Sequence, residues 1–503
     1  MVLSRPKMIL SFLMLTVACA FAASQQPTII QVGKASLSPA LRDMSVVSVP
    51  SQEPAQGQAG PASAEAVIGV NVEGVSAPPN ADLDPSPNGA VGATQYVQWT
   101  NAQIAVYDKS DGSLISGPVA ASSFWSAVGG PCLNAQNNGD GIVQYDKTAA
   151  RWVIMHHATD QHGNWFECFA ISTTSDATGN YFLSDYQWPW SPNTYFPDYV
   201  KLGVWPDAYY LAVDQEQLPK YTNVNVVACA FDRAKMLQGA SYTAQCFTEP
   251  DNLYGHSFLP SDLDGSAQPA KGTPNFFMNL GTNALRLWKF YVNWQDSSQS
   301  QFAGPTTITV NAFTLPCNNG GNCIPQPNTN QHLDSVGERL MNRLVYRTFP
   351  GVTSVLLVSH AVSSSGRTGV RWYAITNPNR ANPVVSQQGT FAPDANSRWM
   401  SSMAMDKVGN VALAYSVSST TVEPAIRFTG RKLSDPANQM VGETSIFEGS
   451  GSQNSAPQWG PYVGMAIDPQ DDCTFWYTNE YLPADGIRNW HTRIASLKFP
   501  NCH

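Results

Sequence analysis

The stretch Trp399 to Ser416, WMSSMAMDKVGNVALAYS, suggests how the whole chain folds. Small or apolar residues alternate with polar ones up to Met405, and the pattern breaks at the Asp-Lys-Val-Gly-Asn segment before it resumes at Val411. Period-two alternation on both sides of an Asp/Gly/Asn turn predicts a β-hairpin. The same pattern returns at Tyr462 to Tyr481, YVGMAIDPQDDCTFWYTNEY, which indicates a repeat.

Further copies of this hairpin precede the two along the chain. They lie at residues 88–101, 141–158, 199–215, 259–281 and 340–362, and an apolar third strand follows each hairpin. Repeated modules of three or more antiparallel strands are typical of a β-propeller, and no useful helix-period segment interrupts them. We therefore predict an all-β chain, a β-propeller of about seven blades. Six or eight blades, and an irregular pair of β-sandwiches, are the alternatives.

The N-terminus resembles an export signal over residues 1–23. Two basic residues precede the apolar run Met8 to Val17, and small residues follow it up to Ala23. We expect cleavage near Ala23 and a secreted or periplasmic protein, with lipidation at Cys19 as the alternative. No later stretch is apolar enough to span a membrane.

The rest of the chain divides into two segments. Residues 24–65 are rich in Gln, Ser, Ala and Pro, which predicts a low-complexity leader or linker. Residues 66–503 are expected to form a single propeller domain and, we expect, a monomer. The alternating segment Ala66 to Val75 is expected to add an outer strand to the last blade, hiding an exposed sheet edge.

The composition narrows the classes of partner. A net charge of −9 argues against nucleic acid as the main partner. Charged residues make up 13% of the chain and aromatic residues 11%, a balance found in many exported β proteins that handle carbohydrate. The alternative is that the aromatic side chains fill the spaces between blades.

Eight cysteines remain after the export signal, an even number that suits an oxidising compartment. We expect four disulfides between sequential cysteines, although spacing alone does not fix their connectivity. The expected pairs are Cys132 with Cys168, Cys229 with Cys246, Cys317 with Cys323, and Cys473 with Cys502.

The propeller geometry predicts where distant residues meet. In each blade the first strand begins, and the second ends, on the same side of the disc, so residues at these points surround one mouth of the central channel. They hold much of the chain's scarce charge. Those that we assign to catalysis are Asp140, Asp198, Asp262, Glu480 and His157. Those that we assign to substrate binding are Arg339, Arg343, Arg398, Trp399, Trp459 and Tyr462.

These residue types suit glycan chemistry. One carboxylate can act as nucleophile or base while a second protonates the leaving oxygen of a glycoside. Arginines bind the carboxylate of an acidic sugar, and His157 or Tyr462 as base would instead favour elimination. The simpler interpretations are turn-capping aspartates, packed histidines, and arginines stacked on tryptophan. If these aspartates serve the mouth, replacing Asp140, Asp198 or Asp262 by Asn is expected to leave folding nearly intact, whereas a large loss of stability in all three variants would identify them as turn caps.

Other motifs add little. The segment DLDPSPNG at 82–89 places Asp82 and Asp84 among alternating oxygen ligands, which predicts calcium as an alternative to a Pro-rich turn. No other cofactor is implied. The chain contains no Gly-x-Ser-x-Gly elbow, phosphate loop or His-Glu-x-x-His motif.

Several phrases resemble exported bacterial β-propeller-like proteins that carry no assigned reaction. They are PNGAVGATQYVQ, YVKLGVWPDAYYLAVDQ, FLPSDLDG, RLMNRLVYR, SRWMSSMAMDKVGNVALAYSVSS and DDCTFWYTNEY, and together they cover nearly the whole mature chain. The resemblance implies the fold and an exported location. Likeness to sialidase-type propellers is architectural only, because MDKVGNVALAY stands where those proteins have a Ser-x-Asp-x-Gly-x-Trp box.

The sequence therefore predicts an exported propeller that binds a polysaccharide or other glycan at its mouth. Glycoside hydrolysis is favoured over polysaccharide elimination as its reaction. The alternative is a non-catalytic module for carbohydrate or protein binding, or adhesion. A third possibility is a scaffold within a larger surface assembly.

Overall fold

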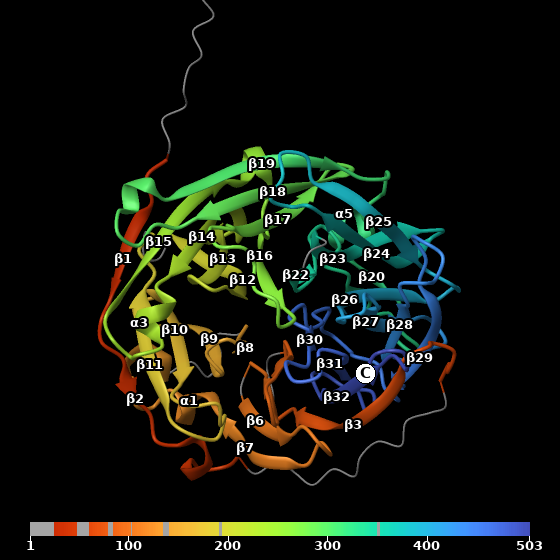
Figure 1. Ribbon diagram of the computed structural model, residues 1–503. Helices are drawn as coiled ribbons and strands as arrows, with labels where there is room; N and C mark the ends of the chain where they lie inside the picture. The colour runs from red at the N-terminus through yellow and green to blue at the C-terminus, as the bar shows by residue number, and fades with distance from the viewer. Residues whose placement is uncertain are drawn as a thin grey trace, which may run out of the picture.

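The computed structural model describes residues 25–47, 60–78, 84–101, 103–133, 140–190, 194–349 and 353–503. Its strands form antiparallel meanders arranged around a common centre (Figure 1). The expected export signal, with Cys19, lies outside the described residues. The chain is an all-β propeller, as the alternating hairpins predicted.

The first three meanders follow one another along the chain. The first is β4 (Asn88–Val91), β5 (Gln95–Trp99), β6 (Gln103–Asp108) and β7 (Leu114–Ala120). The second is β8 (Ile142–Asp146), β9 (Arg151–Thr159), β10 (Trp165–Ser172) and β11 (Tyr181–Gln187). The third is β12 (Tyr195–Val204), β13 (Tyr209–Gln217), β14 (Thr222–Phe231) and β15 (Tyr242–Pro250).

The next two meanders share one eight-stranded sheet. They are β16 (Leu259–Asp264), β17 (Asn275–Gly281), β18 (Ala284–Tyr291) and β19 (Gln301–Thr309), then β22 (Leu344–Phe349), β23 (Thr353–Ser364), β24 (Arg367–Thr376) and β25 (Val384–Phe391). The inner strands β16 and β22 pair in parallel and join the two meanders. Because this sheet does not divide into separate blades, the blade count stays a prediction.

Two more meanders complete the ring. One is β26 (Ser397–Met405), β27 (Val411–Ser418), β28 (Ala425–Arg431) and β29 (Val441–Phe447). The other is β30 (Gly464–Ile467), β31 (Thr474–Tyr481) and β32 (His491–Lys498), with β3 (Val67–Ser76) outermost. The pairing of β3 with β32 confirms the expected outer strand from residues 66–75.

The remaining elements are short. They are α1 (Ala121–Phe124), α2 (Gly130–Leu133), α3 (Arg233–Met236), α4 (Asp251–Tyr254), α5 (Cys317–Gly320), the 3-10 helices at Leu41–Asp43 and Ser297–Gln299, and the strands β20 (Asn322–Ile324) and β21 (Leu333–Asp334). None of the helices in the described ranges is long and apolar enough to cross a membrane.

The hairpin at residues 399–416 forms as predicted. Strands β26 and β27 are buried along their whole length, because neighbouring sheets cover both faces. Asp406 fixes the turn: its Oδ1 accepts hydrogen bonds from the backbone N–H groups of Val408 (3.0 Å) and Asn410 (2.8 Å). The aspartate and the asparagine four residues later therefore stabilise the turn between the two strands.

The expected leader differs from the structure in its described part. Strands β1 (Thr28–Val32) and β2 (Ser36–Leu37) add to the outer strands β15 and β11 of neighbouring sheets. Ile30 and Val32 are buried, so the short alternation TIIQV has a packed face after all. The polar composition of residues 24–65 hid this pattern.

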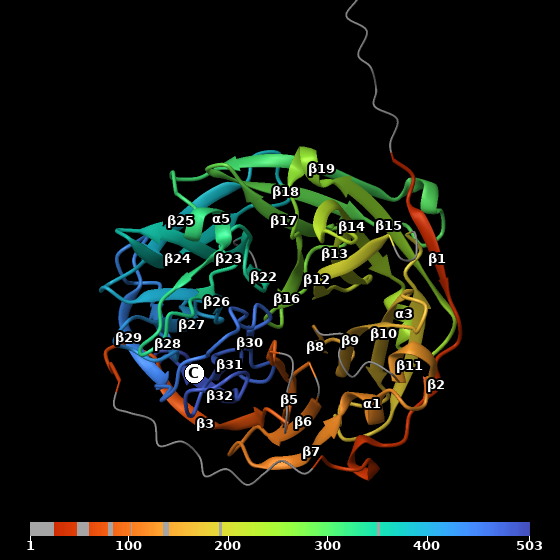
Figure 2. The ribbon, with the colours of Figure 1, turned by 180° about the vertical axis from the view of Figure 1, so that it is seen from behind.

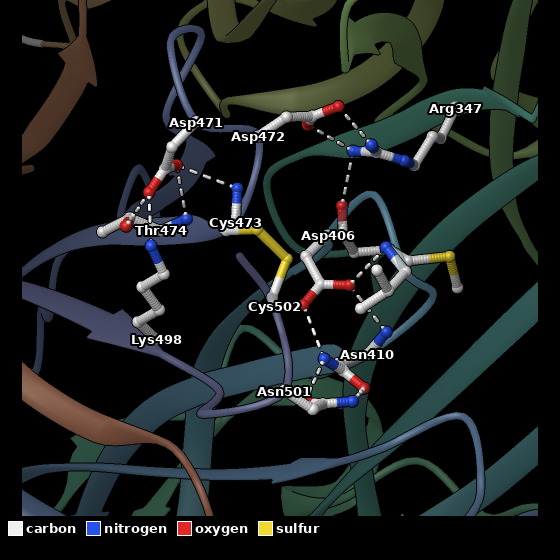
Figure 3. The surroundings of a disulfide bond; sticks show 12 residues. Arg347, Asp406, Asn410, Asp471, Asp472, Cys473, Thr474, Lys498, Asn501 and Cys502 are labelled. Atoms are coloured by element: carbon white, nitrogen blue, oxygen red, sulfur yellow. Dashed lines mark hydrogen bonds and ion pairs between the residues drawn. A yellow bond between two sulfur atoms is a disulfide. The ribbon is translucent and has the colours of Figure 1, made fainter.

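All four expected disulfides are present. The bond between Cys473 and Cys502 ties the end of the chain to the strand β31 that follows Cys473 (Figure 3). Asp471 supports this turn by accepting a hydrogen bond from the backbone N–H of Cys473 at 2.9 Å. On the other side of the disulfide, Asn501 and Asn410 exchange side-chain hydrogen bonds.

Removing this bond should weaken the fold. The double change Cys473→Ala and Cys502→Ala is expected to lower the free energy of unfolding by about 2–4 kcal/mol, because the open chain regains entropy. Urea denaturation without reductant measures the loss. The matched control removes Cys317 and Cys323, which lie 6 residues apart rather than 29. The control should lose less, and an equal loss would contradict the loop-length argument.

Candidate functional site at one mouth of the channel

The inner strands β8, β12, β16, β22, β26 and β30 lie nearest the centre in both views of the molecule (Figures 1 and 2). Polar residues gather where several of these strands begin. We call them the mouth cluster: Asp140, His157, Asp198, Tyr199, Lys201, Arg339 and Tyr462. Five of the residues that the sequence assigned to the mouth belong to it, namely Asp140, His157, Asp198, Arg339 and Tyr462.

An irregularity in β12 places two charges side by side. The pairing of β12 with β13 shifts register between Asp198 and Lys201, and Tyr199 has a left-handed backbone with φ of 50°. A bulge re-aims side chains that plain alternation would send to opposite faces. The Asp198 carboxylate consequently lies close enough to Lys201 to act on the pKa of its ammonium group.

Lys201 lies between two tyrosine rings. Its Nζ is 3.5 Å from the ring centroid of Tyr199 and 3.3 Å from that of Tyr462. Nζ also donates a hydrogen bond to the backbone oxygen of Val200 at 3.2 Å. Burial holds the pKa of Lys201 well below its usual value, and the nearby carboxylates of Asp140 and Asp198 oppose that shift. The ring faces are the kind of surface that stabilises a desolvated cation.

Asp140 is the acid of the cluster. It precedes β8, and its backbone N–H donates to Oδ1 of Asn101 at 2.7 Å. Burial and the Asp198 charge raise the pKa of its carboxyl to about 6, while Lys201 acts in the opposite direction. A carboxyl with this pKa carries a proton into the slightly acidic range, as a general acid needs.

His157 reaches the cluster from the end of β9. Its imidazole is buried, and this burial lowers its pKa to about 4, so the ring is neutral above that pH. Its Nδ1 lies 4.0 Å from Oε2 of Glu167, directly across on β10. Burial also holds the pKa of Glu167 well above its usual range. His156 packs instead near Trp99 and Trp125.

The depressed pKa of His157 gives a pH-dependent stability that can be measured. Between about pH 4 and 6.5 the unfolded histidine binds a proton that the folded one does not, so wild-type stability should rise with pH in this window. Relative to His157→Gln, the gain from pH 4 to pH 7 should be about 3 kcal/mol. Denaturation curves of both proteins at several pH values test this. Parallel curves would mean that His157 titrates normally in the fold.

A second charged group borders the cluster. The guanidinium of Arg339 stacks over the Tyr199 ring at 4.4 Å and binds the neighbouring Glu338 at 2.6 Å. Asp214 accepts hydrogen bonds from the backbone N–H and the hydroxyl of Ser257, both at 2.7 Å. Arg339 is therefore paired with Glu338, and its Nη1 also lies 4.0 Å from Oδ2 of Asp214.

Glu480 lies apart from the mouth cluster. It is buried and accepts a hydrogen bond from the backbone N–H of Gly460. Burial holds the pKa of its carboxyl well above the usual range. Glu480 thus anchors the loop before β30 through Gly460, and no hydrogen bond or ion pair joins it to Asp140 or Asp198, which are both among the described residues.

The assignment of Asp262 to this mouth is wrong. Asp262 lies inside β16, and its Oδ1 accepts from the backbone N–H of Val204, the last residue of β12, at 3.0 Å. It therefore lies at the far end of the inner strands. Together with Asp264 it binds the buried guanidinium of Arg343 at 2.6 and 2.7 Å. Arg343 is consequently a structural ion-pair partner rather than a ligand-binding arginine.

Three further assignments to substrate binding are also wrong. The fully buried Arg398 binds Glu443 on the outermost strand β29 at 2.7 Å, so its side chain points away from the channel. Trp399 and Trp459 are buried in one apolar cluster, with ring centroids 6.0 Å apart. These tryptophans fill the space between neighbouring sheets, as the alternative interpretation of the aromatic composition proposed.

Sequence reasoning missed Lys201 and Glu167. Both are single charged residues inside otherwise apolar strands, YVKLGVW and FECFAIS. An isolated charge at such a position is costly to bury, so its presence in an apolar strand could have indicated a functional residue. The residues predicted from the sequence all lie near strand ends, which is why these two were not among them.

The calcium loop stays a prediction. Asp82 lies outside the described residues, and Asp84 lies 3.7 Å from Arg488, with burial raising the pKa of its carboxyl to about 6. Within the part of the chain that the structure describes, no three His, Cys, Asp or Glu side chains group to hold a metal ion.

Similar structures share the architecture at low identity. An α-L-arabinofuranosidase of Fusarium graminearum covers 86% of this chain and 99% of its own, with 8% identity and a TM-score of 0.38. An α-L-arabinanase of Penicillium chrysogenum covers 87% of this chain and 100% of its own, with 8% identity and a TM-score of 0.37. A lectin of Burkholderia pseudomallei covers 83% of this chain and 96% of its own, with 10% identity and a TM-score of 0.38. No family model and no curated protein matches the chain. At these values the neighbours transfer no substrate or reaction to it.

Proposed function

We propose that this protein binds a glycan at the mouth cluster and hydrolyses a glycosidic bond there. The observation that carries the proposal is the pairing of Asp140 and Asp198, in which Asp140 has a pKa raised to about 6. Two neighbouring carboxyl groups in different environments can take the roles of acid and base. Asp140 would protonate the leaving oxygen, and the Asp198 carboxylate would attack the sugar or activate water.

The surrounding residues support this division of roles. Lys201, between the rings of Tyr199 and Tyr462, lies beside both carboxyl groups and acts to lower the pKa of Asp140. In its protonated form Lys201 would stabilise the ionised carboxylate that remains after Asp140 gives up its proton. The four disulfides further support an oxidising, extracellular or periplasmic location.

Elimination from an acidic sugar has less support. It requires cations that are free to bind the sugar carboxylate, whereas Arg343 and Arg398 are both saturated by carboxylates of the protein. A non-catalytic binding module is the second candidate. It needs only that the partly exposed carboxyl groups of Asp140 and Asp198 accept hydrogen bonds from sugar hydroxyls without reacting.

Incubation with neutral and acidic polysaccharides tests the proposal. Hydrolysis should release new reducing ends and no unsaturated product. Saturable binding without new reducing ends would establish the binding module instead, and unsaturated sugars would establish elimination. A protein that neither binds nor cleaves any polysaccharide of the panel would overturn the proposal.

A further inference from the structure

Aromatic side chains lead from the mouth cluster to the surface on the same side of the disc. We call Trp165, Phe196 and Tyr221 the aromatic track. The ring centroids of Trp165 and Phe196 are 4.7 Å apart, and those of Phe196 and Tyr221 are 5.7 Å apart. Both Trp165 and Phe196 also lie 6.4 Å from the His157 ring of the mouth cluster. The track is therefore continuous with the candidate site.

The track lies at strand ends that face the mouth side. Trp165 begins β10 where β9 has just returned to that side, and Phe196 is the second residue of β12. Tyr221 immediately precedes β14 and is 61% exposed. Trp165 and Phe196 are partly exposed. The Tyr221 ring packs against Phe196 and leaves most of its surface open to solvent, where it can contact a ligand.

Hydrogen-bonding groups stand beside these rings. Phe196 is directly opposite Glu216 on β13, which is in turn opposite Asn223 on β14, so the three side chains share one face of the sheet. Oδ1 of Asn223 is buried and accepts no hydrogen bond within the described residues. Burial and the charges of Asp198 and Asp214 raise the pKa of Glu216 to about 7. An unsatisfied acceptor next to a protonatable carboxyl suits a ligand with hydroxyl groups.

From these observations we infer that the aromatic track binds the chain of a neutral polysaccharide and guides it to the mouth cluster. The inference rests on the proposed function. A sugar ring presents an apolar C–H face to an aromatic ring and hydroxyl groups to amides and carboxyls, which is the combination found on the row Phe196, Glu216 and Asn223. A mixed apolar and polar lining of this kind is usual for small-molecule sites.

The charge of the mouth selects a neutral chain. The carboxyl groups of Asp140, Asp198 and Glu216 outnumber the Lys201 ammonium, and Glu338 neutralises Arg339. A polyanion would meet these carboxylates at the mouth and beside Phe196 and would be repelled. The structure thus reverses the preference for an acidic sugar that the arginines suggested in the sequence.

Affinity electrophoresis in gels that contain one polysaccharide each tests the inference. The probes are the neutral polymers arabinan, xylan and glucomannan and the acidic polymers polygalacturonate and alginate. We expect at least one neutral polymer, and no acidic one, to retard the wild type. Phe196→Ala and Tyr221→Ala should each weaken that retention about tenfold. The matched control is Tyr291→Ala, an exposed tyrosine at the end of β18, which runs away from the mouth side.

The outcomes separate the two proposals. If a neutral polymer binds and both variants bind as wild type does, the track is overturned while glycan binding at the mouth stands. If only acidic polymers retard the wild type, the inference that the ligand is a neutral polysaccharide is overturned. If no polymer retards the wild type, both proposals fall. Circular dichroism of each variant confirms that a loss of retention is not a loss of folding.

Discussion

Replacing Arg343 by methionine should lower the free energy of unfolding by about 3–5 kcal/mol, because it removes the guanidinium that pairs directly with two buried carboxylates and leaves only the more distant Lys147 beside them. Arg343 is 5% exposed and binds Asp262 at 2.6 Å and Asp264 at 2.7 Å. Its Nε also donates to the backbone oxygen of Met465 at 2.9 Å, so it joins two meanders across the channel. Urea denaturation at pH 7 measures the loss.

The matched control for Arg343 is an exposed ion pair. Arg42 and Asp176 are 3.0 Å apart, with side chains 54% and 44% exposed. Arg42→Met should therefore cost less than about 1 kcal/mol. Lowering the pH should shrink the deficit of Arg343→Met, because burial raises the pKa of the folded Asp262 carboxyl and, without the arginine to oppose that shift, the folded variant takes up the proton before the unfolded chain does. Equal losses in the two variants would show that the Arg343 ion pair is not formed.

This ion pair also changes an expectation from the sequence. Asp262→Asn was expected to leave folding nearly intact, like the corresponding changes at Asp140 and Asp198. Because Asp262 instead neutralises Arg343, its replacement should destabilise the fold. For Asp140→Asn and Asp198→Asn, the expectation of nearly intact folding is unchanged.

The repeated hairpins made the fold predictable because turn chemistry and alternation are local. The turn at Asp406 and the strands around it lie within one short segment, so sequence alone locates them. The long loop between β16 and β17 lacks such a compact turn. The hairpin at residues 259–281 was located correctly, but Asp262 was assigned to the start of its first strand, whereas it lies near the end of β16 and so at the other side of the channel.

Side-chain direction was the harder part of the site. The place of Asp140 at the mouth could be predicted because it lies just before the inner strand β8, and Asp198 lies within the first four residues of β12. Arg398 also lies where an inner strand begins, but its guanidinium turns toward Glu443 of the outermost strand. Lys201 enters the mouth cluster only because of the bulge in β12. Neither the bulge nor a partner at a distant position can be recognised from local alternation.

The change Asp140→Asn should reduce kcat/KM for the cleaved glycan by about 10²- to 10⁴-fold, because it removes the proton donor to the leaving oxygen. Glycan binding should change little, since asparagine keeps the size and polarity of the side chain. The wild-type rate should fall as the pH rises through about 6, where the Asp140 carboxyl loses its proton. Initial rates of reducing-end release across a pH series measure both effects.

The matched control for Asp140 is Asp207, whose pKa burial also raises to about 6. Asp207 lies in the turn between β12 and β13, at the opposite end of the inner strands from Asp198, and its Oδ1 accepts a hydrogen bond from Tyr210 at 3.2 Å. Asp207→Asn should therefore leave the rate and its pH profile unchanged. If Asp140→Asn keeps the alkaline decline near pH 6, a different group donates the proton. Because the two carboxyls share a pKa and differ in position, the comparison isolates the contribution of the mouth itself.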